Sequence, residues 1–184
     1  MSQRHSEYDL LPSDSYYTPA WVTEALLAIE DFPKNIWEPA AGNGHMTEVL
    51  KQRGHDVVSG DIQWGPQMDF LKLGADWMGQ REAIVTNPPY SNGLAEKFVR
   101  HALKLTDPVN GKVAMLLPLA WDSAKTRRDL FAEHPAFKAK YTLTRRIRWE
   151  NLKQKKNGPS QNHAWYVWDW GQGPFIGPVL GYLP

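Results

Sequence analysis

The chain has 184 residues, of which 42% are hydrophobic and 22% charged, with a formal net charge of +1 and no cysteine. This length fits one domain with a sizeable core, and the composition is ordinary for a globular protein. No apolar run approaches 18 residues, so no membrane-spanning helix is expected, and without cysteine neither a disulfide nor a thiolate metal site can form. The polar residues 1–14 predict neither a secretory signal nor a transit peptide.

Hydrophobic spacing and helix breakers predict strands that alternate with helices. The predicted strands are residues 34–38, 56–61, 83–86, 112–118, 141–149 and 163–170. The first predicted helix begins with Thr18 as N-cap and Pro19 as first helical residue. Further helices are predicted over residues 45–53, 96–105 and 123–133. This alternation is typical of a doubly wound α/β domain, a Rossmann-like three-layer sandwich with a mostly parallel sheet and a C-terminal antiparallel strand. We expect a lead-in over residues 1–15, one domain over 16–170 and an irregular tail over 171–184, which has four Gly and three Pro.

A glycine turn, residues 38–44 (EPAAGNG), lies between the first predicted strand and a helix. In an open α/β sheet, ligands bind at the carboxyl ends of strands, where such a turn lets the backbone approach closely. It is not the dinucleotide fingerprint, because Thr47 stands at the third glycine position. Asp61 ends the next predicted strand, 19 residues after Gly42, where a carboxylate can accept hydrogen bonds from ribose hydroxyls. A turn and a capping aspartate without function are the alternative, but the pair favours a nucleoside-bearing cofactor.

The tetrapeptide Asn87-Pro88-Pro89-Tyr90 follows the third predicted strand. An exocyclic amino group on a purine is a poor nucleophile because its lone pair is delocalised into the ring, and two acceptors aimed at its protons localise that pair. The side-chain oxygen of Asn87 is one acceptor and the carbonyl of Pro88 the other. The prolines stiffen the turn, and Tyr90 can stack on the target base. A structural turn is the alternative; the functional interpretation is group transfer to a planar amine by positioning and electrostatics.

These motifs together resemble the class I S-adenosylmethionine-dependent methyltransferases, and among them the small phage or prophage N6-adenine DNA methyltransferases. The resemblance covers residues 16–170 and includes Asp69-Phe70-Leu71, which is similar to a segment that contacts the cofactor adenine; for Phe70 a plain core role is the alternative. It implies that Asn87, Pro88, Pro89 and Tyr90 are catalytic and that the protein is cytoplasmic, in a bacterium or a phage-infected host cell. The implied residues that bind S-adenosylmethionine are Tyr17, Thr18, Pro19, Glu38, Ala40, Gly42, Gly44, Asp61, Ile62, Asp69, Phe70 and Asn87.

Positive charge is concentrated between Arg145 and Lys156, where six basic residues and one acid give a local +5 against a chain total of +1. Such a cluster can contact a polyanion, and a solvated loop is the alternative. A base extruded from a duplex gains roughly 1–3 kcal/mol by stacking on an aromatic ring, for which Trp149 is the candidate, with a buried strand tryptophan as the alternative. The predicted nucleic-acid-binding residues are Arg146, Arg148, Trp149, Lys153, Lys155 and Lys156.

The resemblance, together with the basic cluster, implies a methyltransferase acting on N6 of adenine in DNA. An RNA base or a protein glutamine amide is an alternative acceptor, and an inactive cofactor-binding interaction module is an alternative of another class. The basic cluster favours nucleic acid over glutamine without distinguishing DNA from RNA, and the intact Asn87 and Asp61 count against an inactive module. No stretch of 80 or more residues remains for a target-recognition domain, so sequence recognition is short, loose or supplied by a partner.

Overall fold

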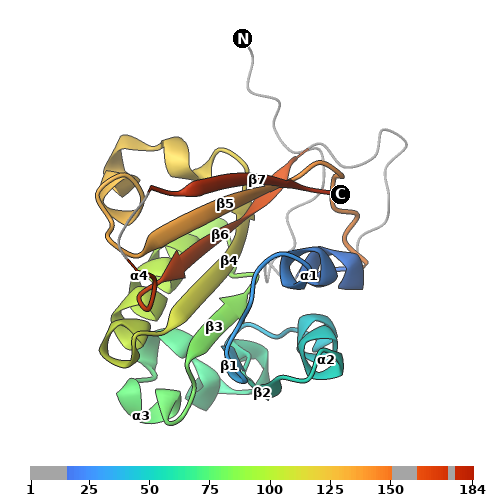
Figure 1. Cartoon of the computed structure of the whole chain (residues 1–184). Coiled ribbons are helices and arrows are strands. Elements are labelled where there is room, and N and C mark those ends of the chain that lie inside the picture. Colours follow the sequence, from blue (N-terminus) through green and yellow to red (C-terminus); the bar gives the residue numbers. More distant parts are fainter. Residues whose placement is uncertain (1–15, 151–160, 174–176) are drawn as a thin grey trace.

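The computed structural model describes residues 16–150, 161–173 and 177–184. A seven-stranded sheet lies between two layers of helices (Figure 1). The strands are β1 (Asn35–Glu38), β2 (Asp56–Ser59), β3 (Ala83–Thr86), β4 (Lys112–Pro118), β5 (Phe137–Leu143), β6 (His163–Asp169) and β7 (Val179–Leu183), in the order β2-β1-β3-β4-β6-β5-β7. Strands β2, β1, β3 and β4 are parallel, β6 is antiparallel to both β4 and β5, and β7 is parallel to β5. The predicted α/β fold, mostly parallel with a C-terminal antiparallel strand, is confirmed.

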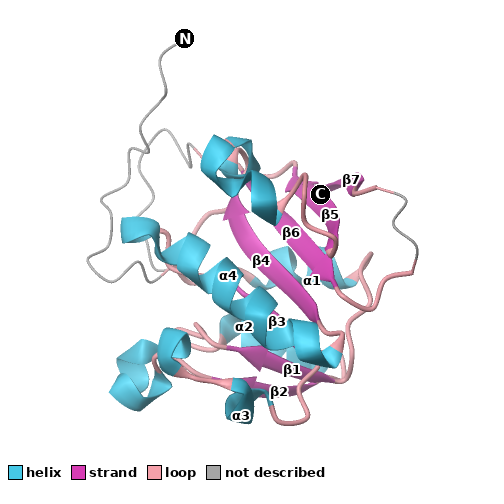
Figure 2. Cartoon of the chain, turned by 90° about the vertical axis from the view of Figure 1, so that its left-hand side faces the viewer, coloured by secondary structure: helices cyan, strands magenta, loops and turns pink. Residues whose placement is uncertain are grey.

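Two hydrophobic cores fill the space between the sheet and its helices. Helices α1 (Ala20–Leu27) and α2 (His45–Gln52) cover one face, and α3 (Ala75–Met78) and α4 (Leu94–Thr106) cover the other, as the turned view in Figure 2 shows. Because helices cover both faces of the central strands, β4 is apolar along nearly its whole length. Short 3₁₀ segments complete the helical structure: Ile62–Trp64, Pro66–Met68, Phe70–Lys72, Ser91–Gly93, Asp107–Val109, Trp121–Ser123 and Lys125–Leu130. No described helix is both long and apolar enough to cross a membrane.

The strand order reverses direction between β1 and β3. The chain passes from β1 to β2 on one side of β1 and then returns to β3 and β4 on the other side. In doubly wound sheets this reversal opens a crevice at the carboxyl ends of the strands. The glycine turn follows β1 and Asn87 follows β3 directly, so the two strongest sequence motifs meet at this crevice.

Two predicted helical features differ from the structure. Helix α1 begins at Ala20 with Pro19 as its N-cap (φ −61°, ψ 146°), and the Thr18 hydroxyl accepts a hydrogen bond from Asn87 rather than capping the helix. The helix predicted over residues 123–133 is replaced by the two 3₁₀ segments that flank Ala124, which is extended. The Ser123 hydroxyl donates to the Ala120 carbonyl, a local bond that competes with a regular helix.

The C-terminal part of the sheet also corrects two predictions. The strand predicted over residues 141–149 is β5, which begins at Phe137 and ends at Leu143, although burial still alternates at Ile147 and Trp149 beyond its end. Residues 171–184 are not wholly irregular, because β7 adds an edge strand beside β5. Gly181 belongs to that strand for a packing reason: a Cβ there would lie 2.7 Å from the Cδ1 atom of Tyr141.

Candidate functional site

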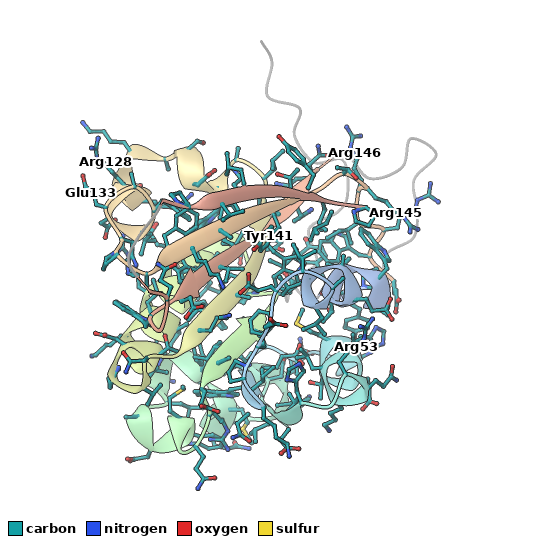
Figure 3. The ribbon with its side chains drawn as sticks, in the orientation of Figure 1. Arg53, Arg128, Glu133, Tyr141, Arg145 and Arg146 are labelled. Carbon is teal, nitrogen blue, oxygen red and sulfur yellow. The ribbon has the colours of Figure 1, made fainter. Side chains whose placement is uncertain are left out.

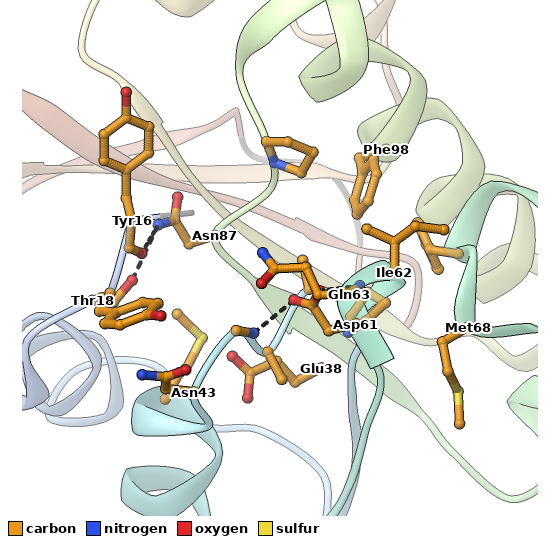
Figure 4. A pocket seen from close by; sticks show the side chains of 18 of the residues that line it. Tyr16, Thr18, Glu38, Asn43, Asp61, Ile62, Gln63, Met68, Asn87 and Phe98 are labelled. Carbon is orange, nitrogen blue, oxygen red and sulfur yellow. Dashed lines mark hydrogen bonds between the residues drawn. The ribbon is translucent and has the colours of Figure 1, made fainter. Parts of the chain in front are cut away.

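A cavity of about 310 Å³ lies at the carboxyl ends of β1 and β3, large enough for a small-molecule site (Figure 4). Ten of the twelve residues predicted to bind the cofactor line it: Tyr17, Thr18, Glu38, Ala40, Gly42, Asp61, Ile62, Asp69, Phe70 and Asn87. The other two, Pro19 and Gly44, precede α1 and α2 as N-cap residues and do not line it. Segments distant in the sequence thus converge on one cavity.

The Asp61 carboxylate holds the glycine turn in place. Its Oδ2 accepts the backbone N–H of Gly42 at 2.7 Å and its Oδ1 accepts that of Gln63 at 2.8 Å. Gly42 has a φ of +54°, a left-handed conformation that favours glycine. Each carboxylate oxygen can accept a second hydrogen bond, so Asp61 supports the turn and keeps acceptor capacity at the cavity wall.

Glu38 is the most deeply buried acid of the cavity, with an exposed fraction of 2%. Its Oε2 accepts a hydrogen bond from the Thr47 hydroxyl, which also pairs with the Ser59 hydroxyl at 2.6 Å. Loss of hydration raises the pKa of Glu38 to about 7, and the Thr47 bonds offset only part of that effect. Glu38 therefore changes charge near neutral pH.

The cavity lining has an acidic balance. Glu38, Asp61 and Asp69 are its carboxylates, and no Lys or Arg is among the described residues that line it. A pyrophosphate would meet three acids and no Lys or Arg among these lining residues, whereas a cationic group and hydrogen-bond-donating hydroxyl or amino groups would meet acceptors. The lining therefore fits a positively charged nucleoside better than a dinucleotide.

The far end of the cavity is formed by the segment after β2. Phe70 is buried in the core against Trp37, Phe98 and His101, with ring centroids 4.8–5.1 Å apart, and part of it reaches the cavity. Phe70 is thus both a core residue and part of the cavity wall. Phe98 of α4 also lines the cavity, which the sequence did not indicate because its position fits the apolar face of that helix.

Asn87 has a fixed amide at the opposite end of the cavity. Its Nδ2 donates to Thr18 Oγ1 at 3.1 Å and to the Tyr16 carbonyl at 3.3 Å, both drawn in Figure 4. Its Oδ1 accepts from the Tyr90 hydroxyl at 2.5 Å. An amide oxygen has two lone pairs, so Oδ1 retains capacity for a second donor.

Four aromatic rings form a group beside Asn87, and one of them, Tyr16, also lines the cavity. Tyr90 stacks near Tyr16, with centroids 6.1 Å apart, and near His163 at 6.0 Å. Trp149 packs against both Tyr16 (5.3 Å) and His163 (5.2 Å). Trp149 is only 3% exposed, which corrects the prediction that it offers a free face to a base. Tyr16, which the sequence did not single out, is half-buried and lies between Trp149 and Tyr90 in this group.

The described part of the basic cluster lies beside this group. Arg145, Arg146 and Arg148 are exposed, and Figure 3 shows Arg145 and Arg146 beyond the end of β5 on the side of α1. Glu150 ties the segment to the cavity, because its carboxylate pairs with His45 at 2.7 Å and its N–H donates to the Tyr17 carbonyl at 3.3 Å. The predicted contacts Lys153, Lys155 and Lys156 lie outside the described residues.

Comparison with known proteins identifies the fold. No protein-family model matches the sequence, and no curated protein matches it. Among solved structures, a Listeria monocytogenes protein described as a candidate class I S-adenosylmethionine-dependent methyltransferase is similar, with a TM-score of 0.58, 15% identity and coverage of 94% of this chain and 67% of that one. A candidate RNA methyltransferase from Pyrococcus horikoshii gives a TM-score of 0.53 at 13% identity over 82% of this chain and 80% of that one. The M protein of the type I restriction enzyme EcoKI gives 0.53 at 14% identity, and this chain covers 46% of its length. The chain thus has the fold of class I methyltransferases.

Proposed function

We propose that this chain is an S-adenosylmethionine-dependent methyltransferase that methylates N6 of adenine in DNA. The observation that carries the proposal is the position of Asn87, which lines the acidic cavity and has its amide held by three hydrogen bonds. The similarity to methyltransferase structures supports the cofactor class, and the candidate RNA methyltransferase and the EcoKI M protein among them, with equal TM-scores, support nucleic acid as the substrate class.

The cavity residues fit the cofactor by the chemistry of their side chains. Asp61 retains acceptor capacity for ribose hydroxyls, and Asp69 can accept from an adenine amino group. Glu38, buried and near its pKa at neutral pH, suits a positively charged neighbour. When bound, S-adenosylmethionine supplies an electrophilic methyl group on a sulfonium.

The chain's own residues then prepare the acceptor. Asn87 Oδ1 accepts a hydrogen bond from one N–H of the target amino group, and the Pro88 carbonyl is the proposed acceptor for the other; together they localise the nitrogen lone pair. Tyr90 provides an aromatic face for the base, and the exposed Arg146 and Arg148 contact phosphates. This chemistry needs positioning and electrostatic complementarity rather than a strong base.

The test is to incubate the protein with methyl-labelled cofactor and, separately, with DNA, RNA and a glutamine-containing protein, and to identify the modified nucleoside or residue. We expect labelled N6-methyladenine from DNA. Label in an RNA base or in glutamine would replace the proposed acceptor, and label in none of them would favour a cofactor-binding interaction module.

The matched variant is Asn87→Ala. Loss of the acceptor oxygen should reduce methyl transfer by at least roughly a hundredfold, as for removal of a preorganised electrostatic group, while the cofactor still binds. Unchanged turnover of this variant would contradict the assignment of Asn87.

A further inference from the structure

The hydrogen bonds of Asn87 determine which way its amide faces. A backbone carbonyl can only accept and an amide nitrogen can only donate, so the bond to the Tyr16 carbonyl requires Nδ2 on that side. The bond from Nδ2 to Thr18 Oγ1 acts in the same direction. Rotation of the amide by half a turn would place Oδ1 against the Tyr16 carbonyl, oxygen against oxygen. Oδ1 therefore faces Tyr90.

Thr18 is well placed to hold this orientation. It is buried and stands directly before Pro19, the N-cap of α1, whose carbonyl accepts the N–H of Val22 at 3.0 Å. On its other side the Tyr17 carbonyl accepts the N–H of Glu150. The Thr18 hydroxyl thus belongs to a short segment anchored on both sides, and Figure 4 shows it beside the Asn87 amide.

We infer that Thr18 is a positioning residue for the proposed methyl transfer: its hydroxyl, with the Tyr16 carbonyl, keeps Asn87 Oδ1 turned toward the acceptor side. This inference rests on the proposed function. It gives Thr18 a role toward the catalytic amide, in addition to the cofactor contact that the resemblance implies. It also explains why residue 87 is an amide here, since the carboxylate of an Asn87→Asp variant would face the Tyr16 carbonyl with an oxygen.

The kinetic test uses Thr18→Val, which keeps the shape and removes the hydroxyl. The kcat at saturating cofactor should fall roughly tenfold, as expected for one lost hydrogen bond, while the KM for DNA stays within about twofold. The Kd for S-adenosylmethionine is measured to set saturation, because Thr18 also lines the cofactor cavity. Thr18→Ser should restore kcat. The matched control is Thr23→Val, because Thr23 is also buried and its hydroxyl has no hydrogen-bond partner in the described structure; all its constants should stay unchanged. An unchanged kcat in Thr18→Val, or a weakened cofactor Kd with full kcat at saturation, would overturn the inference.

A second measurement separates this inference from the proposed function. The side-chain amide signals of Asn87 in a ¹⁵N–¹H spectrum, assigned by their absence in Asn87→Ala, should shift in Thr18→Val and stay in place in Thr23→Val. This readout needs no turnover, so it tests the positioning even if the wild-type protein methylates none of the substrates offered. Asn87 signals that do not move in Thr18→Val would refute the inference, whatever the activity.

Discussion

Replacing Glu38 by glutamine should change how the free energy of unfolding depends on pH. Glu38 is 2% exposed, and burial raises its pKa from 4.5 to about 7. Between these two values the folded protein holds a proton on Glu38 that the unfolded chain has released. The free energy of unfolding therefore falls as pH rises through this window. Glutamine has the shape of the protonated acid and does not titrate, so the variant lacks this loss.

The size of the effect follows from the shift in pKa. A change of about 2.5 units at about 1.4 kcal/mol per unit is about 3 kcal/mol, counted between pH 4.5 and 7. The free energy of unfolding of Glu38→Gln minus that of the wild type should therefore be about 3 kcal/mol larger at pH 7.5 than at pH 4.5. Titrating groups on the surface are common to both proteins and cancel in the comparison.

His163 produces the opposite slope in the wild type. Burial lowers its pKa from 6.5 to about 4, so its contribution to stability is present above pH 6.5 and is lost as pH falls toward 4. The His163 contribution to the free energy of unfolding is also about 3 kcal/mol, so between pH 4.5 and 6.5 the pH dependence due to Glu38 and that due to His163 nearly cancel. In Glu38→Gln the free energy of unfolding should therefore rise with pH over this range, and in His163→Gln it should fall.

The assay is urea denaturation followed by tryptophan fluorescence at half-unit steps from pH 4.5 to 8, without cofactor. The chain has nine tryptophans, most of them near the sheet, so the signal reports on the whole fold. If the curves of wild type and Glu38→Gln run parallel across this range, Glu38 does not carry a raised pKa and the argument from burial fails.

Two further predictions concern buried carboxylates. In Asp61→Asn one carboxylate oxygen becomes an amide nitrogen, so either the Gly42 N–H or the Gln63 N–H loses its acceptor. The Kd for S-adenosylmethionine, measured by calorimetry, should rise at least tenfold, and the free energy of unfolding should fall by about 1–2 kcal/mol. An unaltered Kd would reject the role of Asp61. Glu30→Gln should lower the free energy of unfolding by about 2–3 kcal/mol, because Glu30 is buried against Lys112 and Lys138, although Asp169 still pairs with both lysines. Methyl transfer should be kept, because Lys112 begins β4 and so lies at the end of the sheet opposite Asn87. A loss of methyl transfer that matches the loss of stability would contradict this placement.

The central strands β1, β3 and β4 were predictable because nearly all of their residues are buried. Strands β3 and β4 have the predicted ends, since apolar residues run without interruption and a turn residue follows at once. The glycine turn and Asn87 were recognisable from the chain because both follow such strands. Their meeting at one cavity followed from the general rule for the carboxyl ends of parallel strands.

The remaining features depend on contacts that no local pattern records. Trp149 continues the alternation of β5 after the strand has ended, so its burial against Tyr16 and His163 could not be distinguished from a strand position. The glycines and prolines of residues 171–184 predicted an irregular tail, whereas Gly181 lies in a regular strand and makes room there for the Tyr141 ring. The orientation of the Asn87 amide depends on a hydrogen bond to Thr18, 69 residues away.

The aromatic group connects the cofactor cavity to the C-terminal part of the sheet. Every described residue that lines the cavity lies between positions 16 and 98, and Tyr16 belongs to both sets, whereas Trp149 and His163 of the aromatic group come from the C-terminal part of the chain. Changes at positions 145–149 and 163 leave every lining residue in place, yet they can reach the cavity through the Trp149 contact with Tyr16 and through the contacts of Glu150 with His45 and Tyr17. Cofactor affinity measured across variants of the C-terminal third of the chain would therefore report how strongly that part of the sheet is coupled to the cavity.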